Sequence, residues 1–148
     1  MYWRNWQELS KQELYDLLQL RLSVFAVEQD CPYQDCDDLD QSAVHLLAYQ
    51  DTQLAGYLRV FESLEKYQGQ ASIGRVCCND AMRGTGFGQE LMQEALRYCD
   101  QQFGKDIVIS AQAYLRDFYY NFGFEVASEI YLEDGIEHIR MKRTAKLL

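Results

Sequence analysis

Long apolar runs are missing from this sequence, and so is an excess of positive charge. No stretch approaches the eighteen or more apolar residues that a membrane-spanning helix requires, and residues 1–6 lack the apolar centre of a secretory signal. The 14 Lys and Arg residues are outnumbered by 23 Asp and Glu residues, which gives a formal net charge of −9. Nucleic acids and anionic lipid surfaces bind basic proteins. We therefore expect a cytoplasmic protein whose partners include neither nucleic acid nor a membrane.

Proline occurs once, at Pro32, and the sequence shows no internal repeat, low-complexity tract or linker. A chain of 148 residues is long enough to bury one core and too short for two. We therefore predict a single domain over residues 1–148. The five cysteines are an odd number and include the adjacent pair Cys77 and Cys78, which does not fit a disulfide framework. We expect free thiols in a reducing compartment.

Apolar periodicity predicts a mixed α/β fold. Ser10 is a suitable N-cap with Glu13 at the capping-box position, and apolar residues then recur at helical spacing as far as Phe25. A second amphipathic helix is expected to begin near Gln89. Apolar runs bounded by turn residues predict strands at residues 2–6, 44–50, 54–63, 71–78, 106–111, 126–131 and 137–143, a shorter helix at 114–122 and a turn at 133–135.

The most informative segment is residues 83–88, Arg-Gly-Thr-Gly-Phe-Gly, which follows a predicted strand and leads into the second helix. Glycines allow a tight turn without a Cβ in the way, and the start of a helix offers unpaired N–H groups to an anion. No Gly-Lys-Ser/Thr follows, which excludes a Walker loop, and the glycine spacing differs from that of a dinucleotide-binding fingerprint. The segment predicts a phosphate site in which Arg83 supplies a full positive charge.

Two motifs in this order carry a family resemblance. Arg83-x-x-Gly86-x-Gly88 resembles the acetyl-CoA pyrophosphate loop of the GNAT superfamily of N-acetyltransferases, and residues 119–124, Tyr-Tyr-Asn-Phe-Gly-Phe, resemble the family's Tyr-x-x-x-Gly-Phe motif. The resemblance covers nearly the whole chain. Within the GNAT superfamily, the chain resembles the ElaA-like subgroup at residues 17–21, 24–33, 112–113 and 133–139.

The resemblance implies an acyltransferase that moves an acetyl group directly from acetyl-CoA to an amine, either of a small molecule or of a protein amino group. It implies a mostly antiparallel central sheet with helices on both faces and a splay between the fourth and fifth strands, where the pantetheine arm enters. Backbone groups of Cys77 or Cys78 would stabilise the oxyanion. The residues expected to bind the cofactor are Val76, Cys77, Cys78, Arg83, Gly84, Thr85, Gly86, Phe87, Gly88 and Gln112.

The same resemblance places Tyr119 at the position of the acid that protonates the leaving CoA thiolate. A phenol stays protonated at neutral pH, which suits this role. Packing of the Tyr119 ring in the core is the alternative. The base that accepts the amine's proton is open: the candidates are Glu28, His138 and His45, and a water chain could replace all three.

The cysteines and the acidic run allow other interpretations. Cys77 could form an acyl-enzyme, but a strand cysteine usually behaves as a buried apolar residue. A metal site at Cys31 and Cys36 would lack the short paired spacings of zinc ligands, so we expect no metal. The acidic run at Asp35, Asp37, Asp38 and Asp40 predicts a solvated loop, or alternatively a surface that attracts a cationic amine.

The sequence is also compatible with two other functions, and it does not determine whether the protein forms a homodimer. A CoA-binding module or sensor without transferase activity would have the same phosphate loop, whereas a purely structural protein would have no need of it. Aromatic residues near the ends of the chain complete the core or form a homodimer interface, namely Tyr2, Trp3, Trp6 and Tyr131.

Overall fold

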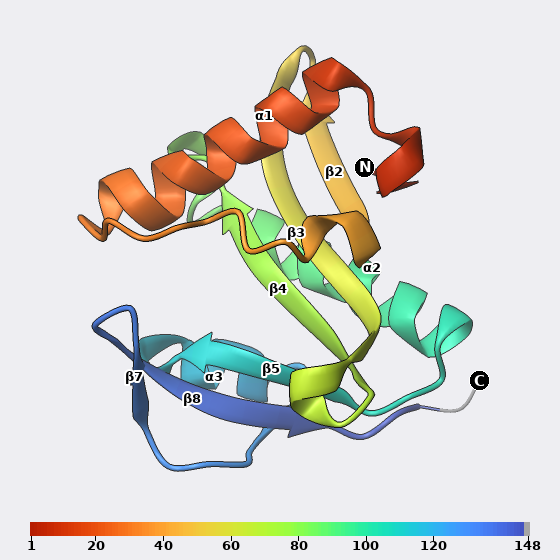
Figure 1. Cartoon of the computed structure of the whole chain (residues 1–148), viewed down its shortest axis with the longest axis vertical. Helices are drawn as coiled ribbons and strands as arrows, with labels where there is room; N and C mark the ends of the chain where they lie inside the picture. Colours follow the sequence, from red (N-terminus) through yellow and green to blue (C-terminus); the bar gives the residue numbers. More distant parts are fainter. Residues whose placement is uncertain (147–148) are drawn as a thin grey trace.

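The computed structural model describes residues 1–146 and contains one mixed sheet with helices on both faces (Figure 1). The strands are β1 (Tyr2–Asn5), β2 (Val44–Gln50), β3 (Gln53–Leu64), β4 (Gln70–Cys78), β5 (Ile107–Gln112), β6 (Glu125–Val126), β7 (Tyr131–Glu133) and β8 (Ile136–Arg143). The α-helices are α1 (Lys11–Leu22), α2 (Phe87–Gln102) and α3 (Arg116–Tyr120). The sheet order is β1-β2-β3-β4-β5-β8-β6, with β7 paired to β8, and β4 and β5 form its parallel pair. This confirms the predicted fold class.

Helix α1 begins at the predicted capping box. The Ser10 hydroxyl accepts the Glu13 N–H at 3.0 Å, and the Glu13 carboxylate accepts the Ser10 N–H at 2.9 Å. The helix buries Leu17 and Leu20 against β2, β3 and β4. Its helical path continues into a π-helical turn, Ser23–Glu28, which carries Glu28 to the end of the sheet. No helix among residues 1–146 is long and apolar enough to cross a bilayer.

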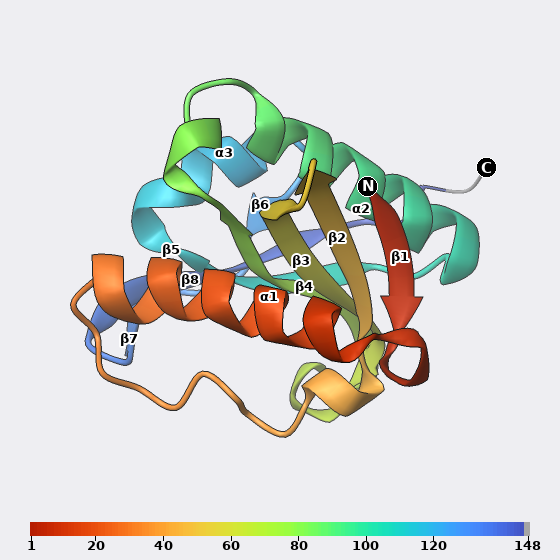
Figure 2. The ribbon, with the colours of Figure 1, turned by 90° about the horizontal axis from the view of Figure 1, so that it is seen from above.

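Helix α2 covers the opposite face of the sheet from α1, as Figure 2 shows from above. It begins at Phe87, two residues before the predicted start, and buries the expected apolar stripe. Gly56 of β3 allows the helix to approach closely, because a Cβ there would lie 2.6 Å from Cε1 of Phe87 and 2.8 Å from Cδ1 of Leu91. The apolar pattern predicted which face is buried, but the role of Gly56 becomes visible only when the two elements are packed.

The predicted splay between the fourth and fifth strands is present. β4 and β5 pair only at Ala71 with Ile107 and at Ser72 with Val108, and the two strands then diverge (Figure 1). Near the end of β4, two residues, Arg75 and Val76, lie opposite only one residue of β3, the one between Tyr57 and Arg59. This two-against-one pairing is a β-bulge. Arg75 has a φ of +54°, a left-handed conformation that an arginine rarely adopts. The bulge bends β4 away from β5 and opens the sheet.

The C-terminal region departs from the prediction in one place. The strand predicted at residues 126–131 is wrong: β6 ends at Val126 and β7 begins at Tyr131. The segment between them is held by Ser128, whose hydroxyl accepts the Arg140 N–H at 2.9 Å. The Ser128 hydroxyl thus accepts the Arg140 N–H, which a backbone carbonyl would accept in a continuous strand. The predicted turn at residues 133–135 is confirmed, with φ of +52° at Asp134 and +77° at Gly135.

The acidic run is neither a solvated loop nor an amine-attracting surface, except at the exposed Asp38. The Asp40 carboxylate lies 2.7 Å from Nη1 of Arg21 and 2.8 Å from Nη1 of Arg59, in the interior. Burial raises the pKa of the Asp40 carboxyl, but hydrogen bonds and charge from the two arginines outweigh burial and hold that pKa below its usual value. Asp35 is likewise buried, 2.9 Å from Nε of Arg21. The prediction failed because the arginine partners are distant in sequence.

Candidate active site

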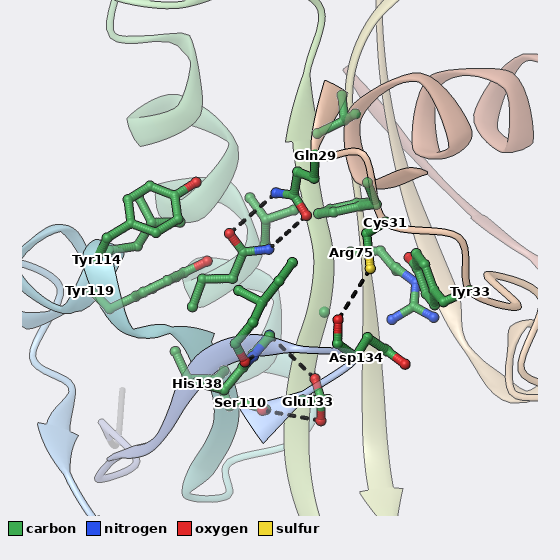
Figure 3. Close-up of a pocket in the computed structure, with 18 of the residues that line it drawn as sticks. Gln29, Cys31, Tyr33, Arg75, Ser110, Tyr114, Tyr119, Glu133, Asp134 and His138 are labelled. Atoms are coloured by element: carbon green, nitrogen blue, oxygen red, sulfur yellow. Dashed lines mark hydrogen bonds and ion pairs between the residues drawn. The ribbon is translucent and has the colours of Figure 1, made fainter. Parts of the chain in front are cut away.

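Two hollows meet where β4 and β5 diverge. We call the first the groove, with a volume of about 490 Å³; it is lined in part by Glu28, Cys78, Arg83 and Phe118. We call the second the inner cavity, with a volume of about 180 Å³; it is lined in part by Arg75, Ser110, Glu133 and His138 (Figure 3). Six residues line both: Val24, Gln29, Val76, Tyr114, Leu115 and Tyr119. The hollows are therefore two ends of one cleft.

The glycine loop lies beside the groove and has the geometry of an anion cradle. Gly84 and Gly86 have φ of +76° and +85°, and a Cβ at either position would meet no atom within 4 Å. Gly86 is the N-cap of α2, and no side chain caps this helix end. The first N–H groups of a helix have no partner within it, so those of Phe87 and Gly88 are available to a ligand. These features fit a bound pyrophosphate.

Arg83 is engaged with two carboxylates beside this loop. Its Nη2 pairs with Oε2 of Glu28 from the π-helical turn, and its Nη1 lies 2.9 Å from Oδ1 of Asp80. The Glu28 hydrogen bond is the largest of the influences that raise the pKa of the Arg83 guanidinium. The structure therefore brings together the predicted phosphate-binding arginine and one predicted base. An anionic ligand would compete with Glu28 for Arg83.

Tyr119 occupies the junction of the groove and the inner cavity. Its ring packs edge-on against Phe118 and Phe124, with centroid separations of 5.1 and 6.0 Å. The side chain also extends into the cavity from the α3 side (Figure 3). Burial, followed by the charge of Tyr114, raises the pKa of the Tyr119 phenol above its usual value, so the group stays protonated at neutral pH. The Tyr119 side chain therefore both packs in the core and lines the cleft.

Comparisons with known proteins agree with this geometry. The family model described as the acetyltransferase (GNAT) domain matches residues 7–145. Protein ElaA from Escherichia coli strain K12 is 45% identical over 139 residues, which cover 92% of this chain and 90% of ElaA. The chain belongs to the GNAT family of acetyltransferases. It is an acyltransferase of the ElaA-like subgroup.

Two solved structures share both fold and sequence with this GNAT protein. The crystal structure of an acyl-CoA N-acyltransferase from Pseudomonas aeruginosa has a TM-score of 0.90 and 43% identity, and covers 97% of each chain. The crystal structure of Escherichia coli ElaA has a TM-score of 0.88 and 42% identity, and covers 97% of this chain and 99% of ElaA. The family uses acetyl-CoA or CoA and acts on amine acceptors.

Strand geometry determines which of the Cys77 and Cys78 N–H groups faces the splay of this GNAT protein. Asn79 donates its N–H to the Ala55 carbonyl of β3 at 2.9 Å. Backbone groups alternate sides along a strand, so the Cys77 N–H also faces β3 and the Cys78 N–H faces the splay. The Cys77 thiol is buried in the core beneath α1, and burial raises its pKa, which disfavours the thiolate form that a nucleophile requires.

Gln112, a predicted cofactor-binding residue, lies at the end of β5 and faces the cleft. Its side-chain amide exchanges two hydrogen bonds of 3.2 Å with Gln29, which follows the π-helical turn (Figure 3). This amide pair crosses the splay between the α1 side and the β5 side. Gln112 is therefore within the site, at the inner cavity, whereas the glycine loop borders the groove.

The two histidines considered as bases lie in different environments. His45, considered as a base, is fully buried between Tyr57 and the Asp40 carbonyl, with ring-nitrogen distances of 2.6 and 2.9 Å. Burial lowers the pKa of His45, and the ring has no access to the cleft, so this candidacy is wrong. His138 lines the inner cavity. The sequence offered no signal to separate them, because each lies in a strand.

Two residues of the cavity were missed as site residues. Arg75 reaches it because of the β-bulge, and its guanidinium is held by Asp35, with Nε 2.9 Å from Oδ1. Glu133 was assigned to a turn, yet its carboxylate lies 3.3 Å from Nε2 of His138. A carboxylate and a histidine five residues apart across a tight hairpin would have been a usable signal for Glu133. Arg75 gave none, because a bulge depends on the partner strand.

Proposed function

We propose that this protein is an acetyl-CoA-dependent N-acetyltransferase that transfers the acetyl group directly to an amine, of a small molecule or of a protein amino group. The observation that supports this most is the continuous cleft through the splay. An anion cradle borders one end, a cavity lined by an acidic residue and a histidine forms the other, and a protonated phenol lies at the junction. Such an arrangement places a phosphate-bearing donor and an amine on opposite sides of one reacting carbonyl.

The donor would be held along the groove. Arg83 and the N–H groups of Gly84, Gly86, Phe87 and Gly88 suit the pyrophosphate. The Thr85 N–H is directed to the Met82 carbonyl at 3.4 Å and would have to leave it to take part. The unpaired edge of β4 from Val76 to Cys78 suits the amides of the pantetheine arm, which would add to the sheet as an extra strand. Gln112 can serve this arm or its acetyl group once it leaves Gln29.

The cleft residues can carry out each proton and charge step of the transfer. A cationic amine must lose a proton before its nitrogen attacks the thioester carbonyl. The Cys78 N–H would stabilise the oxygen that becomes anionic in the tetrahedral intermediate. The Tyr119 phenol would protonate the departing thiolate. His138 is our first choice for the base because it lines the inner cavity, and Glu28, paired with Arg83, is the alternative.

Three proposals concern the setting of the enzyme. Residues 1–148 form one domain, a proposal supported by the family match over residues 7–145. Cytoplasmic location and a homodimer are proposals from composition and from the terminal aromatic residues. Size-exclusion chromatography with light scattering tests the homodimer directly.

The test is calorimetric titration of the protein with acetyl-CoA, with CoA and ATP as controls, followed by a thiol-release assay with primary amines. Saturable binding that prefers acetyl-CoA, with amine-dependent CoA release, is expected. Binding without release by any amine would favour a CoA-binding module or sensor. A folded protein that binds neither acetyl-CoA nor CoA would refute the proposal.

A further inference from the structure

A carboxylate and an imidazole face each other in the inner cavity. Glu133 is the last residue of β7, and the tight turn returns the chain so that His138 of β8 lies diagonally across from it. Oε2 of Glu133 is 3.3 Å from Nε2 of His138, and Oε1 is 3.5 Å from Oγ of Ser110 on β5 (Figure 3). The His138 side chain is 9% exposed and the Glu133 side chain 46% exposed. The carboxylate is thus open to a ligand while the ring is sheltered.

The hydrogen bonds of His138 determine which of its nitrogens can take up a proton. Nδ1 lies 2.8 Å from the backbone carbonyl oxygen of Ile136. A carbonyl oxygen only accepts, so Nδ1 must carry a hydrogen in the neutral ring. Nε2 is then the unprotonated nitrogen, and it is the one that faces Glu133. The carboxylate beside it stabilises the imidazolium that forms when Nε2 gains a proton.

The other charges around the cavity leave Glu133 available for a cation. Among the described residues, Arg75 is the one arginine that lines the cavity, and its guanidinium is already paired with Asp35. The buried Arg21 and Arg59 are likewise paired with aspartates: Asp35, Asp37 and Asp40. Tyr131 stacks on the His138 ring. The titratable or charged groups that line the cavity with His138 are Cys31, Tyr33, Arg75, Tyr114, Tyr119, Glu133 and Asp134.

Building on the proposed transfer to an amine, we infer that the acceptor enters as a primary ammonium bound by Glu133, and that His138 removes its proton with Glu133 as the positioning partner. The ammonium N–H bond breaks and Nε2 of His138 gains the proton. The freed nitrogen lone pair then forms the C–N bond to the thioester carbonyl carbon. The nitrogen loses its second proton to solvent, the C–S bond breaks, and the Tyr119 phenol protonates the thiolate and regains a proton from solvent. The proton on His138 then returns to solvent.

The first test follows the His138 ring itself and needs no acceptor. The chain has two histidines, so the ring nitrogens can be observed by NMR in histidine-labelled protein, with buried His45 as internal reference. We expect His138 to carry its neutral-state hydrogen on Nδ1. In Glu133→Gln, loss of the facing carboxylate should move the Nε2 resonance of the neutral ring, whereas the Nδ1 resonance, set by the Ile136 carbonyl, should move less.

The matched control is Glu137→Gln. Glu137 is exposed, precedes His138 in β8 and points to the other face of the strand, so its loss should move the His138 Nε2 resonance less than half as far. Two results would each overturn the inference: a neutral-state hydrogen on Nε2 of His138, or equal displacements of the Nε2 resonance in the two variants.

The second test is the steady-state kinetics of transfer to a primary-amine panel of spermidine, tryptamine and lysine methyl ester. Glu133→Gln should reduce kcat/KM about fivefold, chiefly by raising KM for the amine, and His138→Gln should reduce it by about 10²–10⁴-fold, chiefly by lowering kcat. Wild-type kinetics in Glu133→Gln, alongside real turnover, would refute the inference and leave the transferase function standing. Absence of acetyl-CoA binding would refute the function instead, while the ring measurement would still report on the pair.

Discussion

Replacing Glu28 by Gln should tighten the binding of acetyl-CoA. Arg83 pairs with Glu28, and an incoming pyrophosphate must displace that carboxylate to use the same guanidinium. The two side chains are 47% and 32% exposed, so the pair falls in the class of exposed ion pairs worth about 0.2–1 kcal/mol. Releasing Arg83 from this competition predicts an affinity gain of about 1.4- to 5-fold.

Isothermal titration calorimetry with acetyl-CoA measures this gain, and a matched variant isolates it. Glu90→Gln removes an exposed carboxylate in the first turn of α2 without touching the pair, so it measures the effect of one less negative charge near the cradle. The excess of Glu28→Gln over Glu90→Gln should shrink between about 0.05 M and about 0.5 M salt.

Two outcomes would contradict this reasoning, and each has its own meaning. Equal affinities of Glu28→Gln and Glu90→Gln would show that Glu28 does not compete for Arg83. Loss of transfer in Glu28→Gln with intact cofactor binding would instead identify Glu28 as the base, and would displace His138 from that role. Wild-type turnover with tighter binding is the result we expect.

Three further predictions address the cradle, the acid and the buried ion pairs. Gly86→Asp should abolish acetyl-CoA binding in calorimetry while circular dichroism stays native, because it places a charged side chain at a left-handed position facing the phosphate. Tyr119→Phe should keep cofactor affinity and slow thiol release by about 10²–10⁴-fold; an unchanged rate would leave only its packing role. Asp40→Asn should cost about 3–5 kcal/mol in urea unfolding, because Arg21 and Arg59 lose a buried charge partner. The lowered pKa of Asp40 means that its contribution is present above about pH 4 and fades below it, so the variant and wild type should converge in acid; a gap that persists at low pH would contradict this.

Features set by neighbouring residues could be predicted well from the sequence. The Ser10–Glu13 capping box, the Asp134–Gly135 turn and the buried stripe of α2 each depend on spacings of a few residues, and all three are present. The glycine loop was predicted for the same reason, since its φ angles and the helix start that follows are local properties. The family resemblance added the splay, which no local pattern could indicate.

Features that depend on distant partners were predicted poorly. The acidic run seemed solvated because its arginine partners lie up to 40 residues away, and a charge is buried only where its partner is also buried. The apolar pattern predicted a strand at residues 126–131, but the Ser128 hydroxyl accepts the Arg140 N–H and interrupts the backbone pairing there. Cys77 and Cys78 are adjacent, yet strand alternation directs one thiol into the core beneath α1 and leaves the other beside α2.

The class of this protein follows from local patterns: an α/β chain with an anion-binding loop before an amphipathic helix and a tyrosine motif after the next strand. Which of the candidate residues share a cleft depends on how the strands pair and pack. β4, which carries the bulge at Arg75, separates from β5, and the separation opens a cavity lined by the sheltered His138 ring and by Glu133, while His45 stays in the core. Pairing between strands that are far apart in the sequence sets these positions, and no pattern within either strand contains that information.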